Sequence, residues 1–289
     1  MDTEIYYFSG TGNSLFIARE LQKRLTGSNL YPIVRLLNEG KIKTNGKIFG
    51  VVFPIHALTV PVAVSKFLRK SDLSSAEYIF VVATRMGIIF NDFKTIHRIL
   101  KEKNKKLNAH FLVNMYSNDS KDENYQASTP EQIKNLEIKA IEQIDSIVEI
   151  IKNRKNHLTP DTGFLINHPY NRIGNYILEK VVITLLKLSE YTGGVNYFYH
   201  DLKCNGCGIC EKVCLSQKIK IVNNHPAWSK EVFCYMCYAC LNFCPEKSIQ
   251  IKDIPGVKSY TEKVGRYCHP YARIRDLSVQ KSGETHAAH

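Results

Sequence analysis

The cysteines are the residues of this chain best suited to chemistry. Eight of the nine lie between positions 204 and 244, in two runs that share the spacing C-x2-C-x2-C-x3-C, and the second run repeats the first 30 residues later. The repeat extends beyond the cysteines, because Ile219 and Ile221 align with Ile249 and Ile251. Dense cysteine patterns of this kind are typical of metal or redox sites. The sequence therefore predicts an internal duplication around two metal centres.

A structural zinc ion is the alternative to an iron–sulfur cluster at such a centre. Zinc sites usually draw their four ligands from two C-x2-C pairs that are well separated in sequence. Here three cysteines fall within seven residues, twice. This spacing fits zinc poorly and favours iron–sulfur chemistry.

The two runs resemble those of two-cluster bacterial ferredoxins, in which the fourth cysteine of each run binds the cluster of the other run. The resemblance implies that one 4Fe-4S cluster has the ligands Cys204, Cys207, Cys210 and Cys244. The other cluster then has the ligands Cys234, Cys237, Cys240 and Cys214. The ninth cysteine, Cys268, is expected to be a thiol that binds no metal.

A second motif lies near the start of the sequence, where an apolar run over residues 5–8 stops at SGTGNS, residues 9–14. A loop of small residues between a strand and a helix presents several backbone N–H groups to one point, which suits a phosphate. The lysine of a nucleoside-triphosphate loop and the third glycine of a dinucleotide loop are both absent. A mononucleotide phosphate remains, held by amide groups and by the hydroxyls of Ser9, Thr11 and Ser14.

This loop resembles the phosphate loop of the flavodoxin family, T/S-x-T-G-x-T/S, which binds FMN. The resemblance implies that the FMN phosphate is bound by Ser9, Gly10, Thr11, Gly12, Asn13 and Ser14. It also implies that the isoalloxazine ring lies between the loops after the third and fourth strands. These loops supply Pro54, Ile55, His56 and Ala57, and then Thr84, Arg85, Met86 and Gly87.

Three of these residues have expected roles at the flavin ring, although neither loop contains the Trp or Tyr that commonly stacks on it. His56 is expected to contact the ring edge, and Met86 to pack on its face. Arg85 is expected to stabilise an anionic reduced flavin by Coulomb attraction and so to raise its reduction potential. An ordinary loop histidine and a solvated arginine are the alternatives for His56 and Arg85.

The elements that position this loop alternate along the first half of the chain. Short runs rich in Val, Ile, Phe and Tyr predict buried strands at 5–8, 30–35, 47–53, 78–84 and 109–115. Amphipathic runs predict helices at 13–25, 61–70, 91–103 and 130–153. This alternation predicts an α/β fold with a doubly wound parallel sheet, which binds ligands outside the carboxyl ends of its strands. The resemblance makes it a flavodoxin-like sheet of five strands, followed by a smaller α+β ferredoxin-like domain.

These predictions divide the chain into four parts. Residues 1–156 form the FMN-binding domain, 157–199 a partly helical bridging segment, 200–255 the domain with two clusters, and 256–289 an extension and tail.

The formal net charge of +12 falls to about +6 once two clusters and a flavin phosphate are included. The densest lysine run, residues 101–106, lies at the end of a predicted helix, where solvent and the helix dipole explain it without nucleic acid. The remaining positive charge predicts acidic redox partner proteins. With no secretory signal and no membrane span in the sequence, a cytoplasmic protein is expected.

The whole arrangement resembles the flavodoxin–ferredoxin fusions of anaerobic bacteria and archaea, which implies electron transfer in an anaerobic cytoplasm. The leading prediction is an iron–sulfur flavoprotein that passes single electrons between low-potential 4Fe-4S clusters and FMN. The alternative is an FMN-dependent reductase of a quinone or nitro compound, although no catalytic residue is assigned, since His56 is the only acid–base candidate near the flavin. A third possibility is a zinc-bearing interaction module on a flavodoxin-like scaffold without flavin.

Overall fold

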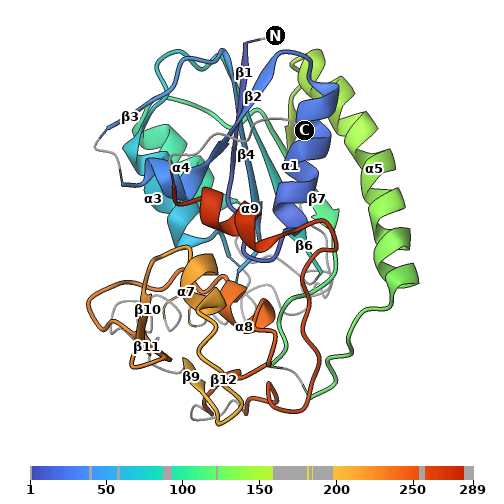
Figure 1. Cartoon of the computed structure of the whole chain (residues 1–289). Helices are drawn as coiled ribbons and strands as arrows, with labels where there is room; N and C mark the ends of the chain where they lie inside the picture. Colours follow the sequence, from blue (N-terminus) through green and yellow to red (C-terminus); the bar gives the residue numbers. More distant parts are fainter. Residues whose placement is uncertain are drawn as a thin grey trace.

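The first half of the chain forms a parallel sheet of six strands in the order β2-β1-β4-β6-β7-β8 (Figure 1). The computed structural model describes residues 2–38, 41–56, 59–86, 93–121, 123–158, 181, 184, 198–253 and 258–282. The strands are β1 (Thr3–Tyr7), β2 (Ser28–Pro32), β4 (Ile48–Pro54), β6 (Tyr78–Arg85), β7 (Ala109–Asn114) and β8 (His157–Leu158). Without the two-residue β8, the strands have the 2-1-3-4-5 order of flavodoxin-like folds. The predicted fold class is confirmed.

Two pairs of helices cover the two faces of this sheet (Figure 1). On one face lie α1 (Asn13–Arg24) and α5 (Pro130–Lys152), and on the other α3 (Val62–Lys70) and α4 (Lys94–Glu102). Successive side chains of a strand point to opposite faces, so Phe49 and Val51 enter the core under α3 and α4, whereas Ile48 and Val52 enter the core under α1 and α5. Burial on both faces explains why the strands are almost continuously apolar.

The second strand differs from its prediction. It ends at Pro32 rather than at residue 35, and Ile33–Leu36 form the short helix α2. Proline has no N–H group to continue the ladder but is tolerated at the beginning of a helix. After α2, Ile42–Lys43 (β3) pairs with Ser71–Asp72 (β5) in a separate parallel pair.

The sixth strand uses residues that the sequence analysis assigned to the bridging segment, 157–199. His157 and Leu158 pair with Ala109 and His110 of β7. Apart from 181, 184, 198 and 199, the rest of that segment lies outside the described residues.

The cysteine-rich part consists of two antiparallel strand pairs and two short helices. The hairpin β10 (Ile219–Val222) and β11 (His225–Trp228) forms one pair, and β9 (Phe198–His200) with the distant strand β12 (Ile249–Ile251) forms the other. Helix α7 (Ile209–Val213) has its counterpart in α8 (Ala239–Asn242). Left-handed backbone conformations recur with the same offset, at Gly206 and Met236 and at Gly208 and Tyr238. The sequence duplication is therefore also a duplication of backbone structure.

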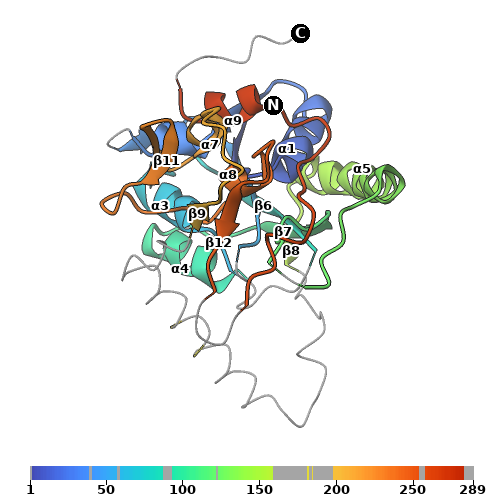
Figure 2. The ribbon, with the colours of Figure 1, turned by 60° about the horizontal axis from the view of Figure 1, so that its bottom comes forward.

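This part lies against the carboxyl ends of the sheet strands, below the sheet in Figure 1 and in front of it in Figure 2. From there the chain runs back along α1 into helix α9 (Ile274–Val279), and the described residues end at 282. Residues 258–282 are called the return segment below. Among the helices of the described residues, none has the length and apolar character needed to cross a bilayer.

The centre of the sheet gives a test of its packing. A Cβ atom at Gly50 would lie 2.2 Å from Cζ of Phe80, which is fully buried on the neighbouring strand β6. Gly50→Ala should therefore overpack the core and lower the free energy of unfolding by about 1–3 kcal/mol, measured as a lower urea midpoint by circular dichroism. In the Phe80→Leu background the same substitution should cost less, and an equal cost would contradict this packing.

Candidate functional site

A cavity of about 270 Å³ opens at the carboxyl ends of the strands, where four loops meet. The first three loops contribute predicted residues, namely Ser9, Gly10, Thr11, Asn13, Ser14, Pro54, Ile55, Thr84, Arg85 and Met86. The fourth loop follows β7 and contributes Tyr116, Ser117, Asn118 and Asp119. The structure thus brings ten of the fourteen predicted flavin-binding residues together around one space.

The first loop has the features of an anion site. Gly12 adopts the left-handed region, with φ of +105°, and its N–H donates to Oγ of Ser9 over 3.1 Å. Within the described residues, the backbone N–H groups of Thr11, Asn13 and Ser14 donate to no partner, although all three residues are buried. Unpaired N–H groups at the start of a twelve-residue helix fit a phosphate.

The other four predicted residues have different positions. Gly12 faces the return segment, because a Cβ atom there would lie 2.3 Å from Cβ of Ala272. His56 packs on Phe8, with ring centres 5.6 Å apart, and is not among the residues that line the cavity. Burial lowers the pKa of His56 to about 4, so its ring is neutral at neutral pH. Ala57 and Gly87 lie outside the described residues.

The loop after β7 was missed by the sequence analysis, yet it supports the first loop directly. Nδ2 of Asn118 donates to Oγ1 of Thr11 over 3.1 Å, and Nδ2 of Asn13 donates to the carbonyl of Tyr116 over 2.8 Å. Its position after the fifth strand was the available signal, since all carboxyl-end loops of a parallel sheet lie at the same edge.

The return segment holds the first loop from the other side. The buried amide of Gln280 accepts from the N–H of Ser9 at 3.2 Å and donates to its carbonyl at 3.0 Å. The hydroxyl of Tyr267 donates to Oδ1 of Asn13 at 2.7 Å, and the N–H of His269 donates to the carbonyl of Thr11 at 2.8 Å. No local sequence pattern marked these residues, because the partners are more than 250 positions apart.

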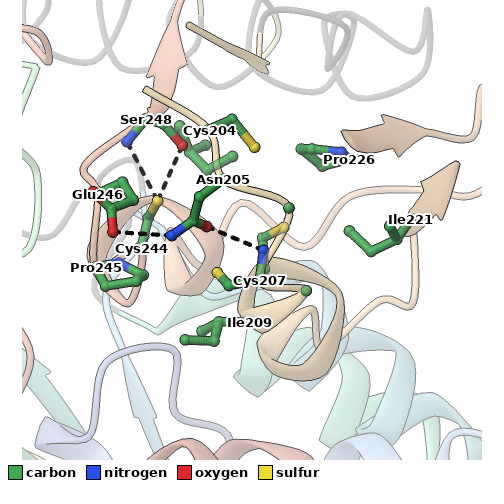
Figure 3. Close-up of a pocket in the computed structure, with 14 residues that line it drawn as sticks. Cys204, Asn205, Cys207, Ile209, Ile221, Pro226, Cys244, Pro245, Glu246 and Ser248 are labelled. Atoms are coloured by element: carbon green, nitrogen blue, oxygen red, sulfur yellow. Dashed lines mark hydrogen bonds between the residues drawn. The ribbon is translucent and has the colours of Figure 1, made fainter. Parts of the chain in front are cut away.

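The first set of cysteines lines one pocket in the cysteine-rich part (Figure 3). It contains three cysteines from the first run and the last cysteine of the second run: Cys204, Cys207, Cys210 and Cys244. Sγ of Cys244 accepts from the N–H of Ser248 at 3.3 Å, and Asn205 bridges the N–H of Cys207 and the carboxylate of Glu246 (Figure 3). The grouping is the one that the ferredoxin resemblance implied.

The second set is more deeply enclosed. Its thiols lie close enough to interact electrostatically with one another, and they are Cys214, Cys234, Cys237 and Cys240. Burial raises the pKa of the Cys234 and Cys237 thiols to about 12, and that of Cys210 in the first set to about 11. These thiols are therefore protonated at neutral pH unless a metal replaces the proton.

The spacing of the sulfur atoms separates a cluster from a single zinc ion. Four thiolates on one zinc, with bonds of about 2.3 Å, lie about 3.8 Å apart. Among the described residues, which include all nine cysteines, no three thiol sulfurs lie within 4.8 Å of one another. The sulfurs are thus spread more widely than the ligands of one zinc ion, which fits a multi-iron cluster.

The loop after β1 and the second cysteine set meet at one backbone contact. A Cβ atom at Gly10 would lie 2.2 Å from the carbonyl oxygen of Cys237, so the first loop and the second cysteine set touch directly. Beside this contact, Tyr235 packs edge-on against Phe8 of the sheet, with ring centres 6.1 Å apart. The first set faces outward, where Cys207 is exposed.

The ninth cysteine, Cys268, lies near Tyr125 and Tyr267, and burial alone raises the pKa of its thiol, to about 12.

Comparison with known proteins supports the assignment of the cysteine-rich part. A family model described as a 4Fe-4S dicluster domain matches residues 203–249. No curated protein matches the chain. The chain thus joins a flavodoxin-like sheet to a 4Fe-4S domain, as the resemblance to flavodoxin–ferredoxin fusions predicted.

Several solved structures show a distant similarity. Rubredoxin oxygen:oxidoreductase from the anaerobe Desulfovibrio gigas has 13% identity and a TM-score of 0.32, over 53% of this chain and 37% of that one. An FMN-dependent NADH-azoreductase from Bacillus anthracis has 9% identity and a TM-score of 0.30, over 50% of this chain and 99% of that one. Trp repressor binding protein from Bacillus subtilis has 12% identity and a TM-score of 0.29, over 49% and 96%. The fold assignment rests on the strand order and not on these similarities.

The amide of Gln280 gives a test of the loop support. Gln280→Ala leaves the N–H and carbonyl of Ser9 buried without partners, at a cost of about 1–3 kcal/mol. If the loop binds the FMN phosphate, the Kd for FMN should rise about tenfold, measured by flavin fluorescence. Gln143→Ala is the control, since Gln143 donates to the carbonyl of Leu112 on an exposed surface. Equal FMN affinity in the two variants would contradict the role of Gln280.

Proposed function

We propose that this chain is an electron-transfer protein that passes single electrons between two 4Fe-4S clusters and FMN. The observation that carries the proposal is the contact of Gly10 with Cys237, which places the second cysteine set directly beside the first loop. A redox carrier gains from this arrangement because electrons can move between neighbouring centres without a diffusing intermediate. The oxygen-sensitive clusters suit the cytoplasm of an anaerobe.

The residues present fit both cofactors. The unpaired N–H groups of Thr11, Asn13 and Ser14 would hold the FMN phosphate, and the loops after β4 and β6 would contact the ring. The two cysteine sets would each hold one cluster as thiolates. When bound, FMN exchanges one or two electrons and each cluster exchanges one. Two clusters therefore hold two electrons, the number that reduces one FMN completely.

The outward-facing cysteine set is the proposed point of contact with an acidic redox partner. Leu202, beside this set, is fully exposed, and Cys207 is exposed as well. The Lys203 and Lys220 side chains remain 61% and 66% exposed, although each pairs with a carboxylate. An exposed Leu202 with the exposed side chains of Lys203 and Lys220 nearby suits a partner whose docking surface is acidic.

Reduction of a small molecule, such as a quinone or nitro compound, is the second candidate function. It is favoured by the open rim of the cavity, where Met86 is 59% exposed. Against it, the predicted acid–base residue His56 packs on Phe8 and does not line the cavity. Oxidation of the dithionite-reduced chain by a quinone, at a rate above that of free FMN, would support this candidate.

Cofactor content tests the main proposal. Protein purified without oxygen should contain about eight irons, eight sulfides and one FMN per chain, because eight thiols form two sets and one loop fits one phosphate. Metal analysis, flavin release and absorption spectra before and after dithionite would measure this. Four irons, or zinc in place of iron, would contradict the two-cluster assignment. Iron without flavin would contradict the FMN site.

Arg85 provides a test of the flavin environment. Its half-buried side chain lines the cavity at the end of β6, so its positive charge should favour the reduced, anionic flavin. Arg85→Ala should therefore lower the two-electron reduction potential of bound FMN, measured by spectroelectrochemistry. Arg69→Ala is the matched control, because Arg69 pairs with Glu102 on an exposed surface. An unchanged potential in the Arg85 variant would rule out this role.

A further inference from the structure

Two histidines lie beside one cysteine of the outward-facing set. The rings of His200, in β9, and His225, in β11, stack with centres 4.8 Å apart and planes within 1° of parallel. One ring nitrogen from each histidine and Sγ of Cys204 all lie within 4.8 Å of one another. Pro226, next to His225, lines the same pocket as Cys204 (Figure 3).

The hydrogen bonds of the two rings differ. Nδ1 of His200 lies 3.3 Å from the carbonyl oxygen of Asp201, which can only accept a hydrogen bond. This carbonyl suits the tautomer of His200 in which Nδ1 carries the hydrogen. His225 can then present a ring N–H to the sulfur of Cys204, with its ring stacked on that of His200.

The internal repeat allows the surroundings of the two cysteine sets to be compared. Cys234 is the counterpart of Cys204. His200 pairs with Ile249, and Trp228 pairs with the counterpart of Ile249, Ile219, so Trp228 takes the place of His200 in the other half of the repeat. Among the described residues, a pair of histidine nitrogens close to a cysteine sulfur is found only at Cys204.

We propose that His225 donates a ring N–H to the sulfur of Cys204 and thereby raises the reduction potential of the cluster that this cysteine holds, with His200 positioning the ring by stacking. The inference rests on the proposed function, since it requires that cluster. Reduction adds one electron from an external reductant, which takes the cluster and its four thiolates from about −2 to −3. A hydrogen bond to a thiolate sulfur becomes stronger as its negative charge grows, so it stabilises the reduced form more.

The experiment is an EPR-monitored potentiometric titration of the anaerobic full chain with dithionite. His225→Phe keeps an aromatic ring but removes the N–H, and His225→Gln keeps an N–H donor. His200→Phe keeps the stacking surface, and His200→Ala removes it. The control is His157→Phe, because His157 also stacks on an aromatic ring, Phe111, but in the sheet.

In His225→Phe, the ratio of reduced to oxidised protein at a given potential should fall about tenfold for one cluster, a shift of about −59 mV for one electron. The other cluster should not shift. His225→Gln should restore part of the loss, and His200→Ala should have a larger effect than His200→Phe. The inference is overturned if His225→Phe shifts neither cluster more than the control does, or shifts both equally.

Iron and sulfide analysis of the same samples separates this inference from the proposed function. Fewer than two clusters in the unsubstituted chain would overturn the proposed function itself. Two intact clusters in every variant, with unchanged potentials, would overturn only the role of His225.

Discussion

The structure depends on the close approach of two backbone segments, Gly10 in the loop after β1 and Cys237 in the second cysteine run. A side chain at position 10 would clash with the Cys237 carbonyl, so only glycine permits this approach. The contact is reinforced by a shared core, because Val213 and Leu215 belong to the same apolar cluster as Phe53 of the sheet. The two modules are therefore packed as one body at this point, and the loop and the cysteine set have a fixed relationship.

The cysteine-rich part has a core that its own side chains complete only in part. Four of the eight buried residues in its apolar cluster are aliphatic, and three are cysteines. Burial raises the pKa of these thiols, as at Cys210 and Cys240, so thiolates would be costly without a compensating cation. An iron–sulfur cluster would supply that compensation and would link the four cysteines that hold it. In a part this small, metal binding and folding are expected to be one process.

Patterns that are local in sequence predicted the fold well. The strands were found because burial on both faces makes them continuously apolar, and helix ends were marked by residues such as Pro130, where α5 begins. The cysteine sets were predictable because each run is compact and repeated. Long-range contacts were not predictable: the packing of His56 on Phe8, the support of Thr11 by Asn118 and the hydrogen bonds of Gln280 to Ser9 depend on tertiary structure. The early end of β2 follows from Pro32, which a count of apolar residues overlooks.

The return segment has a consequence for the order in which the protein matures. Gln280 is synthesised 271 residues after Ser9, the residue whose backbone it holds. During translation the sheet can form before Gln280 exists. The loop after β1 gains its hydrogen bonds to Gln280 only after the cysteine-rich part and the return segment have been synthesised. The ribosome thus imposes a sequence of events in which iron–sulfur assembly can begin before the loop reaches its final form.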